Sequence, residues 1–167
     1  MKRFALITVT IIPILGFASA QCGPSGAHIQ TGEENCSCSG TTANCDTFQL
    51  CGVGNRNANV LLTGSYSATV DCRNKGGNVV TVKAQGVTSS SSTGSLQPRN
   101  GCLTVPKLST TTPTASQFEK MATCPNGNWT PILRPGTTSL DSYTYTLTFA
   151  GCSSPYDPLT LTGSCPA

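Results

Sequence analysis

The sequence of 167 residues has little of what most enzyme active sites need. It contains one histidine, His28, and only 10% charged residues. Every histidine-based catalytic triad and every histidine-ligated zinc site would have to use that one side chain. Because His28 stands in a polar segment between Gly26 and Gly32, we interpret it as an exposed loop histidine.

Other catalytic motifs are also missing. The sequence has neither a Gly-x-Ser-x-Gly nucleophile motif nor a phosphate-binding glycine loop. Its carboxylates give no sign of the pair across a cleft that a glycosidase needs. Six of the seven lie near His28 or singly near turns and strand ends: Glu33, Glu34, Asp46, Asp71, Asp141 and Asp157. We therefore expect a protein that is not an enzyme and uses no cofactor.

Long hydrophobic runs are absent beyond the N-terminus. The first segment combines two basic residues, an apolar stretch over residues 4–17 and a small-residue cleavage site at 18–20. The alternative, a membrane anchor, fits less well, because the stretch is shorter than about 20 residues and contains Pro13. We predict a signal peptide over residues 1–20 and a secreted, extracellular chain over 21–167.

Net charge is nearly absent from the secreted part. Without Lys2 and Arg3, eight basic residues stand against seven acidic ones, a net charge of about +1. This balance gives no electrostatic reason to expect nucleic acid or an anionic membrane as partner. We expect an extracellular protein or a glycan as partner.

Large apolar residues are scarce, whereas cysteine is abundant. Residues 21–167 contain 24 Leu, Ile, Val and Phe, about 16%, below the roughly 20% at which disorder becomes plausible. An even number of cysteines in an exported chain indicates disulfides. Five bridges at about 2–4 kcal/mol each would match the net stability of a whole domain. We expect ten paired cysteines, with the pairing left open: Cys22, Cys36, Cys38, Cys45, Cys51, Cys72, Cys102, Cys124, Cys152 and Cys165.

Cys36 and Cys38 form a Cys-x-Cys pair. In an extended segment their side chains share one face, and they are too close in sequence to bond each other comfortably. We therefore expect them to bond different partners. A metal site of soft thiolates is the alternative, which an oxidising compartment disfavours, so we predict no metal.

Alternating patterns typical of half-buried strands dominate the sequence. In DSYTYTLTFAGC (141–152), threonines alternate with Tyr143, Tyr145, Leu147 and Phe149. In NVLLTGSYSATVDC (59–72), one register contains Val60, Leu62, Tyr66, Ala68 and Val70. Gly64 falls in the same register, which indicates a bulge or a close backbone approach.

Shorter patterns complete the prediction. RNKGG (73–77) predicts a hairpin turn into a strand at 78–87. Further strands are expected at 101–106, 129–133 and 158–163, and a short helical turn at Ala115–Met121. Together these patterns predict an all-β fold, a disulfide-rich antiparallel β-sandwich.

The cysteine pattern divides the secreted chain. Residues 21–58 predict a loop-rich, Cys-rich N-terminal extension, and residues 59–167 a β-sandwich domain. The Ser/Thr-rich stretches 88–95 and 108–116 predict flexible connections. Two small domains split near residues 88–99 are the alternative.

The stretch TCPNGNWTPI (123–132) predicts a strand corner held by a disulfide at Cys124. We expect Trp129 in the core, against a disulfide; an exposed sugar-stacking platform is the alternative. Asn-x-Ser/Thr triplets begin at Asn35 and Asn128 and predict glycosylation, so we expect a glycoprotein.

The segments SYSATVDCRNKGGNVVTV and ATCPNGNWTPI each combine a cysteine, a glycine turn and a strand. This sequence pattern resembles that of small secreted cysteine-rich nematode domains of the six-cysteine type. The resemblance covers less than half of the secreted chain, and the ten cysteines depart from the family pattern. Since the function of those domains is unknown, the resemblance implies no mechanism.

We expect a secreted, disulfide-stabilised, non-enzymatic domain that acts by extracellular binding or structural interaction. One alternative is a protease inhibitor or other defence protein that presents Arg134-Pro135 or Pro98-Arg99 on a rigid loop. Another is a carbohydrate-binding module that uses exposed Tyr143, Tyr145 or Trp129.

Overall fold

The computed structural model describes residues 23–152 and 159–165. Within them the chain forms eleven strands and one short helix, which confirms the predicted all-β, disulfide-rich fold. The predicted signal peptide, Cys22 and Asp157 lie outside the described residues. None of the described helices has the length and apolar character needed to cross a membrane.

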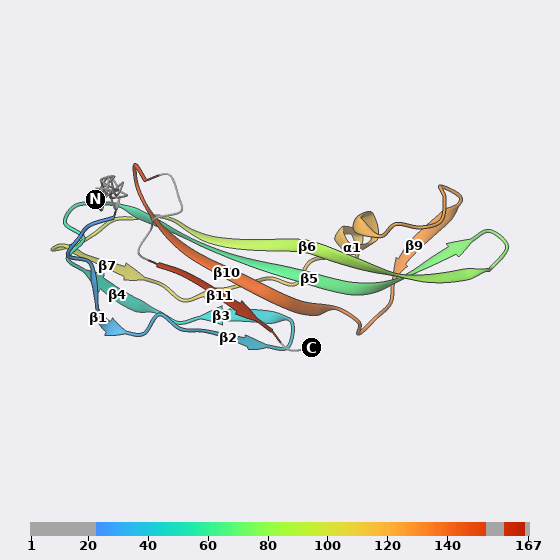
Figure 1. Ribbon diagram of the computed structural model, residues 1–167, viewed down its shortest axis with the longest axis horizontal. Coiled ribbons are helices and arrows are strands. Elements are labelled where there is room, and N and C mark those ends of the chain that lie inside the picture. Colours follow the sequence, from blue (N-terminus) through green and yellow to red (C-terminus); the bar gives the residue numbers. More distant parts are fainter. Residues whose placement is uncertain (1–22, 153–158, 166–167) are drawn as a thin grey trace, which may run out of the picture.

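The largest sheet has the strand order β11-β10-β5-β6, and all its pairs are antiparallel. A fifth strand, β9, pairs with the end of β5 that β10 does not reach. Figure 1 shows the long β5–β6 hairpin running the length of an elongated molecule. The bounds are β5 (Ala58–Asn74), β6 (Val79–Leu96), β9 (Trp129–Leu133), β10 (Ser139–Phe149) and β11 (Leu159–Ser164).

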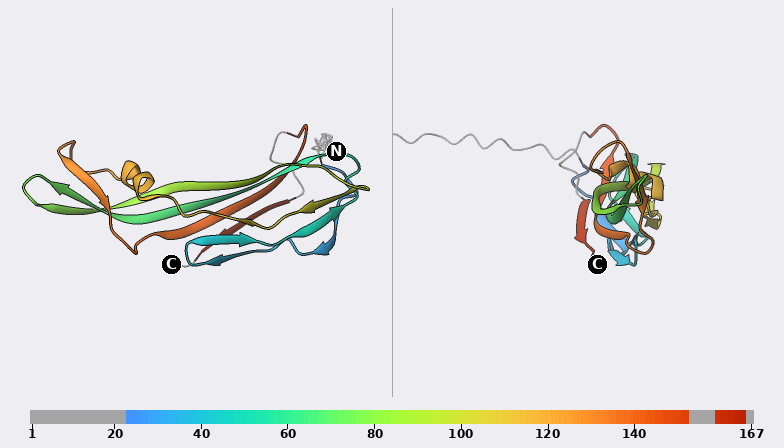
Figure 2. Two further views of the ribbon diagram at one scale, coloured as in Figure 1. Left: turned by 180° about the vertical axis from the view of Figure 1, so that it is seen from behind. Right: turned by 90° about the vertical axis from the view of Figure 1, so that its right-hand side faces the viewer.

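Two three-stranded sheets, β1-β4-β7 and β2-β3-β8, make the second layer (Figures 1 and 2). Their strands are β1 (His28–Gly32), β2 (Cys36–Ser39), β3 (Thr42–Cys45), β4 (Phe48–Cys51), β7 (Cys102–Val105) and β8 (Leu108–Ser109). Half of the described part of the segment expected to be loop-rich is therefore strand, because β7 and β8 supply backbone partners from far along the chain. The predicted boundary at residues 58/59 stays a prediction.

The core lies between the layers, as the alternating patterns predict. On β5 the side chains of Val60, Leu62 and Tyr66 are fully buried, and on β10 those of Leu147 and Phe149 are too. They form one cluster with second-layer side chains from β3, β4 and β7. Gly64 confirms the predicted close approach, because a methyl group there would lie 2.8 Å from the Tyr66 ring.

The predicted flexible connection at residues 88–95 is wrong. These residues belong to β6 and pair with β5 on both sides of a register shift at Thr93 and Gly94. Their hydroxyl groups add cross-strand hydrogen bonds: Thr63 and Ser90 hydroxyls lie 2.9 Å apart, and Ser92 donates to Asn59 Oδ1 at 2.8 Å. β6 thus crosses the region where the alternative placed a domain boundary.

The second Ser/Thr-rich stretch, 108–116, is not a flexible connection either. Thr110 is buried, and its hydroxyl oxygen accepts hydrogen bonds from the Ala43 amide at 2.9 Å and the Tyr66 hydroxyl at 2.8 Å. The stretch leads into α1 (Ala115–Met121), which confirms the predicted helical turn. α1 is anchored by Phe118, whose side chain is fully buried.

Beyond Ser139, where β10 begins, the β5–β6 hairpin continues into a part of the molecule that we call the distal arm. The distal arm consists of residues 69–83 and 115–136 (Figure 1). It contains the turn predicted at 73–77, where the Gly77 amide donates to the Asn74 carbonyl at 3.1 Å. One face of its three strands carries the buried Val70 and is covered by α1. The opposite face is left exposed.

Four disulfides are described: Cys36–Cys45, Cys38–Cys165, Cys51–Cys102 and Cys72–Cys124. Cys152 is disulfide-bonded as well, and no described cysteine is free. The different partners of Cys36 and Cys38 confirm the prediction from their spacing. Cys36–Cys45 and Cys51–Cys102 join paired strands, whereas Cys38–Cys165 joins the second layer to the chain just after β11.

The bridges should contribute unequally, because closing a longer unfolded loop removes more chain entropy. Cys38–Cys165 spans a sequence separation of 127 and Cys36–Cys45 one of 9. We predict that Cys38→Ala/Cys165→Ala lowers the free energy of unfolding by about 5 kcal/mol and Cys36→Ala/Cys45→Ala by about 2.5 kcal/mol. Urea unfolding of the oxidised proteins measures both losses. Equal losses would contradict the loop-length argument.

The Tyr145 hydroxyl is buried and has no hydrogen-bond partner among the described residues. Burial, with a smaller effect of the Glu34 charge, raises the pKa of Tyr145 to about 12. Removing an unsatisfied hydroxyl relieves a desolvation cost, so we predict that Tyr145→Phe raises the free energy of unfolding at pH 7 by about 1 kcal/mol.

The same variant should change the pH dependence. Because the folded-state pKa lies above the usual value of 10.0, the unfolded chain loses the Tyr145 proton at lower pH than the folded protein does. Titration of Tyr145 therefore leaves the free energy of unfolding of the wild type unchanged below pH 10 and lowers it as the pH rises toward 12. Urea unfolding at pH 7 and pH 11 should show a steeper loss for wild type than for Tyr145→Phe. Destabilisation by Tyr145→Phe at pH 7 would show that the hydroxyl is satisfied.

Candidate binding face

The structure does not assemble the single histidine into a catalytic group. His28 is exposed, as predicted, but it lies on β1 and not in a loop. Its Nδ1 lies 3.0 Å from the Gly26 carbonyl oxygen and its Nε2 3.3 Å from Gln30 Oε1. In the described part of the chain, no three His, Cys, Asp or Glu side chains are grouped closely enough to hold a metal ion.

The carboxylates have separate surroundings. Glu34 is exposed but lines a cavity of about 330 Å³ with His28, and partial burial of its carboxyl group raises the pKa of Glu34. The other residues that line this cavity are apolar. Glu33 and Asp46 are exposed, and Asp141 accepts a hydrogen bond from the Ser67 hydroxyl at 2.8 Å. This arrangement offers no second carboxylate across from Glu34 among the residues that line the cavity.

Arg134, one of the residues considered for a protease-binding loop, is exposed but forms an ion pair with Asp71 of the same chain. Its guanidinium donates to both Asp71 carboxylate oxygens, from Nη2 at 2.6 Å and from Nε at 3.2 Å. This hydrogen bonding, with a smaller contribution from Thr81, lowers the pKa of Asp71. A protease would have to displace this ion pair to take the Arg134 side chain.

Arg99, the other such residue, is exposed at a tight turn. Its amide donates to the Cys102 carbonyl at 2.8 Å, and the Cys102 amide donates back at 3.0 Å. Asn100 and Gly101 take the left-handed φ values, 52° and 76°, that such a turn requires. The turn is fixed at its base by the disulfide to Cys51.

The aromatic residues proposed as a sugar-binding platform are not exposed in the way that platform requires. Tyr145 is 1% exposed, and Tyr143 is half-buried, with its hydroxyl donating to the Cys36 carbonyl at 3.1 Å. The Tyr143 ring lies so close to Gly163 that a methyl group there would be 2.5 Å from it. Both side chains therefore support the inner packing of β10.

The strand corner at residues 123–132 is confirmed, since Cys124 bonds Cys72 and β9 starts at Trp129. The placement of Trp129 in the core is wrong. Trp129 is half-buried and lies outside the core cluster, because β9 pairs it with Asn74 at the tip of the distal arm, where the core has ended.

Both predicted glycan acceptors are accessible. Asn35 and Asn128 are exposed, and the Asn128 amide donates to Asn126 Oδ1 at 3.0 Å in the turn before β9. Glycosylation at either residue stays a prediction.

A further surface, which the sequence analysis did not identify, is the outer face of the large sheet. Residues directly opposite each other on antiparallel strands share a face. The register therefore puts fifteen side chains on the face that points away from the second layer. They are Asn59, Leu61, Thr63, Ser65, Thr88, Ser90, Ser92, Ser95, Ser142, Thr144, Thr146, Thr148, Thr160, Thr162 and Ser164. We call this set the hydroxyl face.

The hydroxyl face is uncharged and dense in donors and acceptors. Thirteen of its fifteen side chains are serine or threonine, and none is charged. One row crosses four strands as Thr162, Thr144, Thr63 and Ser90. Leu61, 42% exposed, adds an apolar contact at its centre. Such a face can exchange hydrogen bonds with a partner without removing a charge from water.

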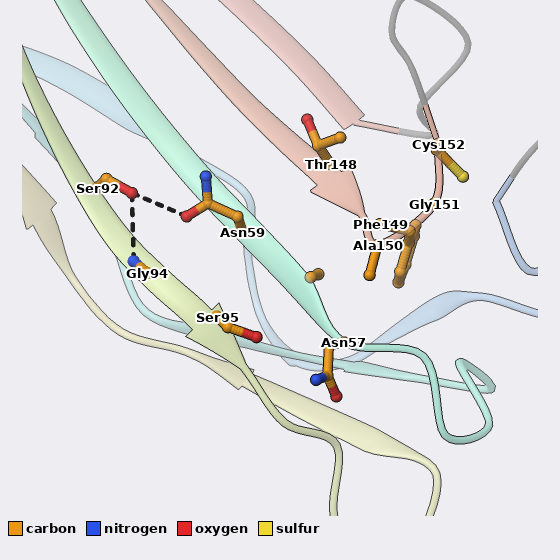
Figure 3. Close-up of a pocket in the computed structure, with 11 residues that line it drawn as sticks. Asn57, Asn59, Ser92, Gly94, Ser95, Thr148, Phe149, Ala150, Gly151 and Cys152 are labelled. Carbon is orange, nitrogen blue, oxygen red and sulfur yellow. Dashed lines mark hydrogen bonds between the residues drawn. The ribbon is translucent and has the colours of Figure 1, made fainter.

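Among the described residues, two hollows lie on the hydroxyl face. Where β5, β6 and β10 meet at one end, a pocket of about 510 Å³ is lined by Asn57, Asn59, Ser92, Ser95 and Thr148, among others (Figure 3). The Ser92 hydroxyl, which donates to Asn59, also accepts from the Gly94 amide at 3.2 Å. This bonding fixes two of the lining side chains.

A second hollow of about 240 Å³ lies between β10 and β11. The side chains of Ser142, Thr144, Thr162 and Ser164 line it. Both hollows thus lie on the hydroxyl face, at different places along β10.

Comparison of the chain with protein-family models, curated proteins and solved structures gave no match.

Proposed function

We propose that the chain is a secreted, non-enzymatic binding domain that holds a neutral polysaccharide against its hydroxyl face. The observation that carries the proposal is the uncharged Ser/Thr surface over four strands, with two hollows on it. Secretion is supported by the signal-peptide pattern and by a framework in which no described cysteine is free.

The chemistry of the face favours a hydroxylated partner without charge. Serine and threonine hydroxyls both donate and accept hydrogen bonds, as sugar hydroxyls do. Threonine methyl groups and Leu61 supply apolar contact for the faces of sugar rings. Strand pairing on both sides of β5 and β10 holds these side chains on a rigid support, which reduces the entropy lost on binding.

A charge placed on the face should prevent binding, because it would be buried without a partner. We predict that Thr144→Glu/Thr162→Glu reduces retention on particles of at least one neutral polysaccharide (cellulose, chitin or a β-1,3-glucan) by about tenfold. Depletion of the protein from solution by the washed particles measures the retention.

The matched control is Thr31→Glu/Ser39→Glu, which places the same charges on exposed residues of β1 and β2 in the second layer and leaves both Asn-x-Ser/Thr triplets intact. It should bind as the wild type does. The proposal is wrong if the wild type is not retained on any of the three polysaccharides, or if the control loses as much retention as the face variant.

A second candidate function, inhibition of a trypsin-like protease, is favoured by the exposed Arg99 turn beside the Cys51–Cys102 bridge. Rigid presentation of an arginine lowers the entropic cost of binding in a basic-specific pocket. If this candidate is right, Arg99→Ala abolishes inhibition of trypsin, whereas Arg134→Ala leaves it unchanged. Absence of inhibition by the wild type in a chromogenic assay would exclude this function.

A further inference from the structure

The small net charge of the secreted chain conceals an uneven distribution. Five of the eight basic residues outside residues 1–20 belong to the distal arm, and only two of the seven acidic residues do. The basic residues of the arm are Arg73, Lys75, Lys83, Lys120 and Arg134. Its acidic residues are Asp71 and Glu119.

Both acidic side chains of the arm are already engaged within it. Asp71 is held by Arg134 through two hydrogen bonds. Glu119 accepts a hydrogen bond from the Leu133 amide at 3.0 Å. The arm therefore carries an excess of three positive charges, and its carboxylates are occupied by internal donors.

The strand register places Arg73 and Lys83 on the exposed face of the arm, opposite α1. Asp71 and Arg73 alternate with the buried Val70 and Cys72, so their side chains point away from α1. Lys83 is opposite Thr69 and therefore shares that face with Arg73. Lys75 extends from the adjoining turn. Along the strands, Arg73 and Lys83 stand about 14 Å apart, at about 3.4 Å per residue.

We propose that the basic face of the distal arm, formed by Arg73, Lys75 and Lys83, binds a sulfated polysaccharide. The charges are spread along an open, extended surface, which suits a polymer whose negative groups repeat along its length. The basic face also continues the same side of β5 and β6 that carries the hydroxyl face. A glycan chain on it would meet hydroxyl groups at one end and cations at the other.

This site is separate from the one under the proposed function. It uses residues of the distal arm, which lies beyond the first residue of β10, and none of them belongs to the hydroxyl face. Failure of neutral-polysaccharide binding would leave it intact, and its own failure would leave the hydroxyl face intact.

The test measures binding of the full secreted chain to heparin by calorimetry at several salt concentrations. We expect wild-type binding that weakens steeply with salt, since the contacts are exposed ion pairs. Arg73→Gln/Lys83→Gln should weaken it about tenfold and reduce the salt dependence. The control Arg99→Gln/Lys107→Gln removes the same charge from exposed residues outside the arm and should change affinity less than twofold.

Three outcomes would overturn the inference. The first is that heparin does not bind to the wild type. The second is equal weakening by the arm variant and the control, which would show that only net charge matters. The third is equal or tighter binding of polyglutamate, which would identify an acidic peptide as the better partner. Denaturant unfolding of both variants verifies that each is folded.

Discussion

The structure depends on covalent connection of two layers that share a small core. Only 24 Leu, Ile, Val and Phe residues are available outside residues 1–20, and the strands of the second layer are two to five residues long. Sheets this small bury too little apolar area to be stable on their own. Cys38–Cys165 ties the second layer to the end of β11, and the shorter bridges close β2–β3 and β4–β7.

With the second layer held in this way, alternation along β5 and β10 gives the large sheet two different faces. The inner face concentrates the few large side chains, such as Tyr66 and Phe149. The outer face is left to Ser and Thr, which combine good strand propensity with polarity. Further along β5 the same outer side carries Arg73 and the Asp71–Arg134 pair. One sheet thus presents a neutral and a basic surface in sequence.

Local patterns predicted the elements well where side-chain alternation was strong. The tyrosines of β10, the turn after Arg73 and the strand at 129–133 are where the sequence places them. The Ser-rich part of β6 was missed because it lacks an apolar face; β5 and hydroxyl hydrogen bonds hold it as strand. The prediction for Trp129 was wrong because its burial depends on where β9 lies along the arm. The local sequence does not encode that position. The hydroxyl face could not be predicted, because its residues come together only through the register of four strands, which local sequence patterns do not reveal.

The central claim is that disulfides replace missing apolar burial. The most direct measurement is the near-ultraviolet circular dichroism of residues 21–167 at 25 °C, with all disulfides intact and after complete reduction without denaturant. Our account predicts that reduction abolishes the aromatic signal, because the fixed environments of Tyr66 and Tyr145 are lost. An unchanged signal in the fully reduced protein would contradict the account.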